Sequence, residues 1–237
     1  MGSVSSPVAS PPDVGVVIVA AGAGVRAGPG EPKQFRPIHG VPMLLRTLRP
    51  FTSHPAVSQV VVALPAGVAE RPPEWLGKLL GDRLRLVPGG AARAQSVRAG
   101  LRALPPGASV VVVHDGARPF VSRETIDNVI ARARAGVGAV AAVPLHDTIK
   151  EVADDRITRT VARERLWRAQ TPQGFPRAMI DEAYARLRKE DAVPTDDAEL
   201  CERAGFAVEV ISDTPHNLKV TTADDFRIAE ALARELR

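Results

Sequence analysis

The sequence predicts an α/β protein whose core is a doubly wound, mainly parallel, Rossmann-like sheet. Short apolar runs such as residues 14–20 have no polar interruption, which is typical of strands buried on both faces. Amphipathic helical segments follow most of these runs, and such alternation favours parallel strands joined by helices. A chain of 237 residues with 45% hydrophobic residues is also long enough to build the core of one such domain.

The expected strands and helices alternate along most of the chain. Apolar runs predict strands at residues 14–20, 60–64, 84–87, 110–113, 139–143, 206–211 and 218–220. Apolar stripes at helical spacing predict helices at residues 41–51, 92–104, 125–135, 177–189 and 196–204, and a last helix that begins at Thr222. Ser122 is the expected N-cap of the third helix, and Thr222 with Asp225 has capping-box spacing.

The alternation breaks at two polar–apolar segments, residues 148–152 and 156–161, which flank Ala153-Asp154-Asp155. This pattern predicts a β-hairpin inserted into the α/β frame. An isolated hairpin is marginally stable in water, so we expect it to pack on something, such as a second subunit. We therefore expect a flexible segment at residues 1–12, one domain at 13–237, and a dimerisation arm at 146–163 that makes the protein a homodimer.

Charge and cysteine content narrow the classes of partner. The net charge is +4, but basic and acidic side chains are interspersed, so we expect a small anionic substrate and no nucleic acid. The one cysteine, Cys201, cannot form a disulfide within the chain, which fits a reducing compartment and a cytoplasmic protein. No apolar run reaches the ~18 residues that would span a bilayer, so no membrane association is expected.

A glycine-rich loop follows the first expected strand, over residues 22–32. Glycines let the backbone approach phosphate oxygens, and Arg26 and Lys33 add cationic donors. Gly22, Gly24 and Ala27 also match a dinucleotide-binding pattern, but the prolines that follow prevent a helix from starting there. A P-loop is excluded as well, because no Gly-Lys-Ser/Thr follows.

Lysine is scarce, with only five residues among 31 basic side chains. A chain that prefers arginine so strongly can keep lysine where a compact point charge is needed. Lys33 and Lys219 are therefore candidate site residues, although a solvated surface amine remains the alternative for each.

The second candidate motif is His114-Asp115-Gly116-Ala117-Arg118-Pro119. Asp115 follows a buried strand, at the edge where open α/β sheets bind ligands. A carboxylate there can hold Mg²⁺ or another divalent cation, with substrate phosphates as further ligands. The alternative is a capping or salt-bridged aspartate. Arg118 can contact a phosphate or Asp115, and His114 is expected to be structural.

Together these motifs resemble those of the 2-C-methyl-D-erythritol 4-phosphate cytidylyltransferase family. The resemblance covers nearly the whole chain and rests on seven motifs in order. They are Ala20-Ala21-Gly22 through Arg26 with Pro32-Lys33-Gln34, Gly89-Gly90 with Arg93 and Ser96, Asp115 through Pro119, Asp147-Thr148-Ile149-Lys150, Thr171-Pro172-Gln173, Thr195-Asp196-Asp197, and Asn217 through Thr221.

The resemblance implies a nucleotidyltransferase-type fold and an enzyme that transfers CMP from CTP to methylerythritol phosphate, in isoprenoid precursor synthesis. It implies that Arg26 and Lys33 are catalytic and neutralise the triphosphate, and that Asp115 binds magnesium. The implied nucleotide-binding residues are Ala20, Ala21, Gly22, Ala23, Gly24, Gly89, Gly90, Ser96 and Lys219. The implied acceptor-binding residues are Arg118, Thr148, Arg163, Thr171 and Thr195, with Lys219 also near the acceptor.

The sequence departs from the family pattern at Ala27, where methionine is usual, and at Ala91, where aspartate is common. The aspartate of the family is expected to help hold the base or ribose, so Ala91 bears on whether the chain selects a pyrimidine. Two alternatives therefore remain open. The chain can be a nucleotidyltransferase for ribitol phosphate, another sugar phosphate or a molybdopterin, or a catalytically silent nucleotide-binding regulator, against which intact Arg26, Lys33 and Asp115 argue.

Overall fold

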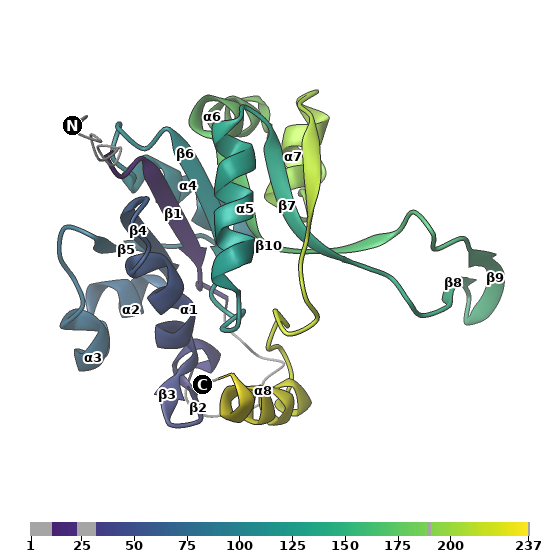
Figure 1. Ribbon diagram of the computed structural model, residues 1–237, viewed down its shortest axis with the longest axis horizontal. Coiled ribbons are helices and arrows are strands. Elements are labelled where there is room, and N and C mark those ends of the chain that lie inside the picture. The colour runs from purple at the N-terminus through teal and green to yellow at the C-terminus, as the bar shows by residue number, and fades with distance from the viewer. Residues whose placement is uncertain (1–10, 23–31, 189–190, 237) are drawn as a thin grey trace, which may run out of the picture.

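The computed structural model describes residues 11–22, 32–188 and 191–236. Within these ranges a seven-stranded sheet runs through the molecule in the order β11-β7-β10-β6-β1-β4-β5 (Figure 1). Its parallel pairs are β1 with β4, β1 with β6, β4 with β5, and β7 with β11. These strands are β1 (Val14–Val19), β4 (Val57–Leu64), β5 (Leu84–Pro88), β6 (Val110–Asp115), β7 (Gly138–Pro144) and β11 (Val208–Ser212). The predicted α/β fold with a mainly parallel sheet is confirmed.

One strand, β10 (Trp167–Pro176), was not predicted from the sequence. It lies between β6 and β7 and is antiparallel to both. Its sequence contains two prolines and a glycine, which normally argue against a central strand. Pro172 lies where the pairing of the strand with β7 is irregular, between Ala169 and Gln173, and Pro176 is the last residue of the strand.

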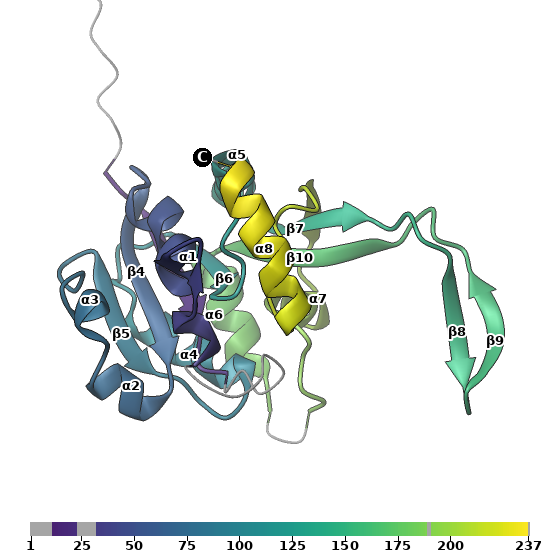
Figure 2. The ribbon, with the colours of Figure 1, turned by 90° about the horizontal axis from the view of Figure 1, so that it is seen from below.

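Helices cover both faces of the sheet, as expected for a doubly wound fold (Figures 1 and 2). On one face, α1 (Met43–Thr52) and α5 (Arg123–Arg134) pack on side chains such as Val16 and Val60. On the other, α4 (Arg93–Ala103), α6 (Arg177–Arg186) and α7 (Asp197–Arg203) pack on side chains such as Val17 and Val111. Alternate residues of β1 therefore belong to different cores, which explains its uninterrupted apolar sequence.

The ends of several elements differ from the prediction. Helix α1 begins at Met43 rather than at residue 41, because Pro42 is its N-cap and pairs in a short hairpin of β2 (Pro37–Ile38) and β3 (Val41–Pro42). Helix α6 ends at Arg186, short of the predicted 189. The prediction of a strand at 218–220 is wrong, since only single backbone bonds such as Val220 N–H to Ala117 O hold that segment. Three short helices were not predicted, namely η2 (Lys33–Phe35), α2 (Ala66–Glu70) and α3 (Glu74–Gly77).

The predicted hairpin is confirmed as β8 (Ile149–Ala153) and β9 (Arg156–Val161), which pair antiparallel. Asp154 and Asp155 form its turn with φ of 48° and 60°. Figure 2 shows this arm projecting from β7 and β10, well away from the body of the molecule. Two apolar side chains on the arm are more than half exposed, Val152 at 54% and Ile157 at 65%.

The last helix, α8 (Ala223–Glu235), packs beside the carboxyl ends of the central strands (Figure 1). Its Ala229 and Ala233 share a third apolar cluster with Ile38, Met43 and Val220. The predicted capping box is present, with Asp225 N–H donating to Thr222 Oγ1 and Thr222 N–H donating to an Asp225 carboxylate oxygen. The predicted cap of α5 by Ser122 is confirmed as well.

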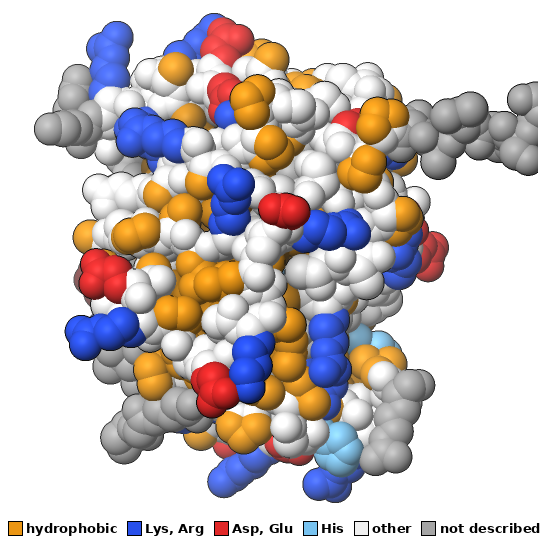
Figure 3. Space-filling model, turned by 90° about the vertical axis from the view of Figure 1, so that its left-hand side faces the viewer, with side chains coloured by type: hydrophobic (Ala, Val, Ile, Leu, Met, Phe, Trp, Pro, Cys, Tyr) orange, Lys and Arg blue, Asp and Glu red, His pale blue; other side chains and the backbone are white. Residues whose placement is uncertain are grey.

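None of the helices in the described ranges is both long and apolar enough to cross a membrane. On the face shown in Figure 3, basic and acidic side chains are interspersed and separated by small apolar areas. The predicted flexible segment 1–12 lies outside the described residues apart from Pro11 and Pro12.

Candidate active site

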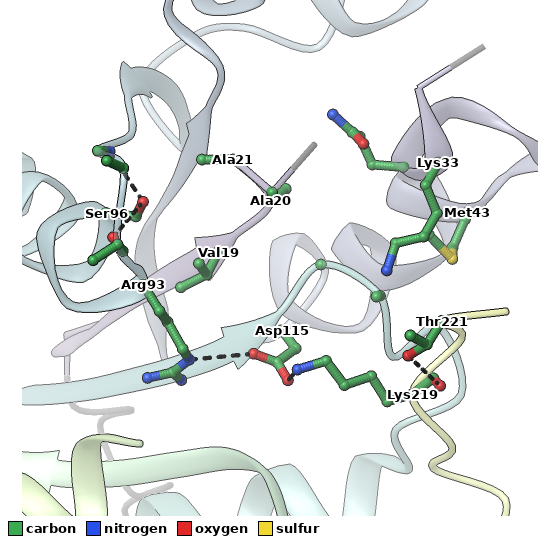
Figure 4. A pocket seen from close by; sticks show the side chains of 17 residues that line it. Val19, Ala20, Ala21, Lys33, Met43, Arg93, Ser96, Asp115, Lys219 and Thr221 are labelled. Carbon is green, nitrogen blue, oxygen red and sulfur yellow. Dashed lines mark hydrogen bonds and ion pairs between the residues drawn. The ribbon is translucent and has the colours of Figure 1, made fainter. Parts of the chain in front are cut away.

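A cavity of about 620 Å³ opens at the carboxyl ends of β1 and β6. Open α/β sheets bind ligands at this edge, where strand ends and the following loops leave a crevice. Figure 4 shows that its lining comes from five separate segments of the chain. They are Val19–Gly22, Lys33–Gln34 with Met43, Gly90–Arg93 with Ser96, Asp115–Ala117, and Lys219 with Thr221.

Asp115 ends β6 at the floor of this cavity and is 7% exposed. Three cationic side chains surround its carboxylate, and Figure 4 shows two of them, Arg93 and Lys219. Lys219 Nζ lies 2.8 Å from Oδ2, Arg93 Nε lies 3.6 Å from Oδ1, and Arg118 Nε lies 3.6 Å from Oδ2. Burial by itself raises the pKa of Asp115, but Lys219, Arg93 and Arg118 together outweigh it and hold that pKa well below its usual range. The carboxylate is therefore ionised at neutral pH.

Lys219 and Lys33 approach the cavity from a C-terminal segment and from the turn η2. Lys33 Nζ donates to Val220 O at 3.0 Å, and Val220 N–H donates to Ala117 O at 2.8 Å. The cluster of Val220 with α8 fixes this segment over the loop that follows β6. Two lysines that the sequence singled out are therefore brought to one cavity, as the scarcity argument suggested.

A hydrogen-bonded chain fixes the backbone of Asp115. Its N–H donates to Thr171 Oγ1 at 2.9 Å, the Thr171 hydroxyl donates to His114 Nδ1, and His114 Nε2 donates to Arg118 O at 3.0 Å. Burial, only partly offset by that last hydrogen bond and by Asp115, lowers the pKa of His114 to about 4. His114 is thus neutral and structural, as expected, and Thr171 supports the loop from a position only 4% exposed.

The loop after β5 forms another wall of the cavity. A Cβ atom on Gly89 would come within 2.4 Å of the Ala21 Cβ and 2.8 Å of Ser96 Oγ, so only glycine fits there. Ser96 is 1% exposed and its hydroxyl accepts from Gly90 N–H at 3.1 Å. Its side chain therefore shapes this loop, and the backbone of residues 90–92 is what the loop presents to the cavity.

The candidate residues that the structure describes fall into three groups. Those that line the cavity are Ala20, Ala21, Gly22, Lys33, Gly90, Ser96, Asp115 and Lys219. Directly behind it lie the half-buried Gly89 and the buried Arg118 and Thr171. Three others lie elsewhere: Thr148 and Arg163 are exposed at the base of the arm, and Thr195 donates to Glu199 beside the start of α7. Ala23, Gly24 and Arg26 lie outside the described residues.

Sequence reasoning assigned no role to a buried polar group beside Asp115. Arg93 Nη1 lies 2.7 Å from Asp197 Oδ2, and the Tyr184 hydroxyl donates to Asp197 Oδ1 at 2.7 Å. Asp197 is fully buried. Burial lowers the pKa of Arg93, but Asp197 and Asp115 outweigh it and raise that pKa above its usual value. Arg93 and Asp197 both stand inside recognised motifs, yet their pairing becomes visible only when α4 and α7 are placed side by side.

The donor set suits a hard cation that brings its own phosphate ligands. No group of three or more His, Cys, Asp or Glu side chains gathers anywhere in the described ranges, so no all-protein metal cage is present there. Mg²⁺ is commonly held by one or two carboxylates together with substrate phosphates. Asp115, ionised and facing a cavity lined by two lysines, fits that arrangement.

A doubly wound sheet with a cation-lined cavity at the ends of β1 and β6 defines an α/β enzyme that binds a phosphorylated ligand. Comparison with known proteins makes the class specific. Residues 14–235 match the family model for IspD, 2-C-methyl-D-erythritol 4-phosphate cytidylyltransferase. The chain belongs to this family of nucleotidyltransferases.

Individual members of this family are similar to the chain over nearly its full length. The chain is 40% identical to 2-C-methyl-D-erythritol 4-phosphate cytidylyltransferase of Syntrophus aciditrophicus, covering 94% of this chain and 97% of that protein. It is 44% identical to the same-named enzyme of Frankia casuarinae, covering 95% and 83%. The crystal structure of the Thermus thermophilus enzyme superposes with a TM-score of 0.79 at 36% identity, covering 94% and 99%.

Proposed function

We propose that this protein transfers CMP from CTP to 2-C-methyl-D-erythritol 4-phosphate and releases pyrophosphate, a step in isoprenoid precursor synthesis. Membership of the cytidylyltransferase family over residues 14–235 is the observation that carries this proposal. The cavity supports it, since two lysines and one ionised aspartate suit a triphosphate with a divalent cation.

In the proposed reaction a phosphate oxygen of the acceptor attacks the α-phosphorus of CTP. A new phosphorus–oxygen bond forms, the bond from the α-phosphorus to the bridging oxygen breaks, and pyrophosphate leaves with that electron pair. Such transfers depend on positioning and on electrostatic stabilisation more than on covalent participation by the protein. Lys33, together with Arg26, is proposed to stabilise the charge that develops at the α-phosphate.

The remaining nucleotide contacts are proposed for the walls of the cavity. Backbone groups of residues 20–24 and of Gly89 and Gly90 suit the close approach of a nucleotide, because these positions carry small side chains or none. Ser96 is proposed to act through the shape of its loop. Because Ala91 replaces the usual aspartate, selection of cytosine is assigned to backbone groups of this loop.

Asp115 is proposed to hold the divalent cation, Mg²⁺ in the cell. When bound, the cation neutralises phosphate charge and orients the triphosphate. In this proposal Lys219 moves from its ion pair with Asp115 to a substrate phosphate, while Arg93 and Arg118 remain beside the carboxylate.

The acceptor site is proposed to form between two subunits of a homodimer in the cytoplasm. Thr148 and Arg163 lie at the base of an arm that carries exposed Val152 and Ile157 and needs a packing partner. A two-fold dimer with crossed arms brings these residues to the partner's cavity. Thr195 is proposed to contact the acceptor from the subunit that binds CTP, and Thr171 and Arg118 are proposed to support the site from behind.

The test is release of pyrophosphate by purified protein with each of the four nucleoside triphosphates and Mg²⁺. Methylerythritol phosphate and ribitol phosphate serve as alternative acceptors. We expect release only with CTP and methylerythritol phosphate. Faster release with ribitol phosphate would make ribitol phosphate the acceptor. If neither acceptor leads to release of pyrophosphate, the proposed reaction is contradicted.

A further inference from the structure

Arg93 lies between two carboxylates, and its guanidinium is closer to one of them than to the other. Its Nη1 lies 2.7 Å from Asp197 Oδ2, whereas its Nε remains 3.6 Å from Asp115 Oδ1. A guanidinium readily forms a paired, two-point contact with a single carboxylate. The observed position therefore requires something that keeps Arg93 from closing on Asp115.

Asp197 is built to provide that restraint. It is the first residue of α7, is fully buried, and its Oδ1 accepts from the Tyr184 hydroxyl at 2.7 Å. Its backbone N–H donates to Gln173 Oε1 at 3.1 Å. Tyr184 belongs to α6 and Gln173 to β10, so Asp197 is anchored to α6 through its carboxylate and to β10 through its backbone.

The cost of this arrangement argues for a role beyond stability. Burying an ion pair costs desolvation energy that its attraction often fails to recover, so a buried pair is weak evidence of a stabilising role. The pair joins α4, which carries the loop of Gly90 and Ser96, to α7, which follows Thr195. It thereby connects the wall of the cavity to the segment of Thr195, which is proposed to contact the acceptor.

We propose that Asp197 is a positioning residue that holds the Arg93 guanidinium away from Asp115, so that Asp115 Oδ1 stays available to a divalent cation. This inference rests on the proposed function, in which Asp115 binds that cation. When Asp197 loses its charge, Arg93 turns to the remaining carboxylate and competes with the metal.

The test uses Asp197→Asn, which keeps an acceptor for the Tyr184 hydroxyl, and the double variant Arg93→Gln/Asp197→Asn, which carries no unpaired buried charge. Glu202→Gln removes an exposed carboxylate from the same helix and is the matched control. Binding of Mn²⁺ is measured by electron paramagnetic resonance in the presence of a non-hydrolysable CTP analogue, and thermal unfolding is recorded for each variant.

We expect Asp197→Asn to bind Mn²⁺ about tenfold more weakly, the range for losing a group that orients a metal ligand. The double variant is expected to bind Mn²⁺ at least as tightly as the wild type, because the competing cation is gone. A purely structural role for Asp197 predicts instead that the double variant is no better than the single one.

Two results would overturn the inference. One is unchanged Mn²⁺ binding in folded Asp197→Asn, and the other is a double variant that binds about tenfold more weakly than the wild type. If Asp197→Asn does not fold, the double variant still tests the inference, because clearly weaker Mn²⁺ binding in that variant overturns it. Wild-type protein that binds Mn²⁺ with the analogue but releases no pyrophosphate with the acceptor contradicts the proposed function alone.

Discussion

Lys219 Nζ lies 2.8 Å from Oδ2 of Asp115, so a residue from the C-terminal segment closes the cavity that the end of β6 opens. The contact forms because Val220, next in sequence, is buried against α8 and bonded to Ala117 O. The Asp115 carboxylate thereby holds together the end of β6 and the segment of Lys219. Its substitution therefore gives the most direct test of the proposed metal site.

Asp115→Asn is expected to raise the Mg²⁺ concentration for half-maximal activity by about tenfold or more. Mutation of a group that merely orients a metal ligand already lowers metal affinity by about that factor. The reason is that a neutral amide is a poorer ligand for a hard cation. Magnesium is titrated at fixed CTP, with Asp224→Asn as the control, because Asp224 is exposed and pairs with the exposed Arg227 on α8. An unchanged titration curve with unchanged turnover would assign Asp115 to loop structure.

Lys33→Ala and Arg26→Ala are each expected to lower turnover roughly 100- to 1000-fold, the range for losing one donor that stabilises the transition state. Turnover is measured at saturating CTP in folded variants. Lys78→Ala is the control, since that lysine is exposed and pairs with Glu74, the first residue of α3. Losses below fivefold in both variants would place these charges outside the active site.

The crossed-arm dimer predicts that Arg163 acts in trans to Lys33. Lys33→Ala and Arg163→Ala proteins, each nearly inactive, are unfolded and refolded as an equimolar mixture. Half of the dimers are then mixed, and each holds one site with both changes and one with neither, which restores roughly a quarter of wild-type activity. Background activity in mixtures shown to contain mixed dimers would place Arg163 in the same subunit's site.

Stability is expected to fall as the pH drops from about 6.5 to about 4. The pKa of His114 is lowered to about 4, so in this window the unfolded chain binds a proton that the folded one excludes. Stability from this group is therefore complete above pH 6.5 and is lost on acidification, by about 3 kcal/mol at most. His54, whose pKa is lowered by burial, adds a contribution in the same direction.

Chemical denaturation at several pH values measures this slope. His114→Gln should flatten it, whereas His216→Gln, at an exposed position, should leave it unchanged. A wild-type slope retained in His114→Gln would assign the acid sensitivity to other groups.

Gly100→Ala is expected to destabilise the protein by about 1–3 kcal/mol, the usual cost of overpacking a core. A Cβ atom there would come within 2.4 Å of Val17 Cγ1, where α4 packs on β1. Gly77→Ala is the matched control, because a Cβ atom on Gly77 would meet nothing within 4 Å. Helix propensity alone would make both changes stabilising, so equal effects in thermal unfolding would contradict the packing argument.

Most elements of the fold could be predicted because their signals are local. The apolar run of β1, the cap residue Ser122 and the alternation in β8 and β9 can each be recognised within a few consecutive residues. Strand β10 could not be predicted, because prolines and glutamines are unusual in a buried central strand. The buried glutamine side chains need hydrogen-bond partners, and these come from other elements. Gln173, for example, bonds to Asp196 and to the start of α7.

The same division holds for the candidate site. Sequence alone indicated the family and the α/β class and singled out Lys33, Asp115 and Lys219 as candidate site residues, because glycine-rich loops, strand ends and rare lysines are marked by residue type and order. Only the tertiary structure decided that Lys219 faces Asp115 and that Thr171 supports the backbone of Asp115 from behind. It also decided that Arg93 lies between Asp115 and Asp197. Those relations depend on distances between segments far apart in the chain, and burial and charge act through such distances.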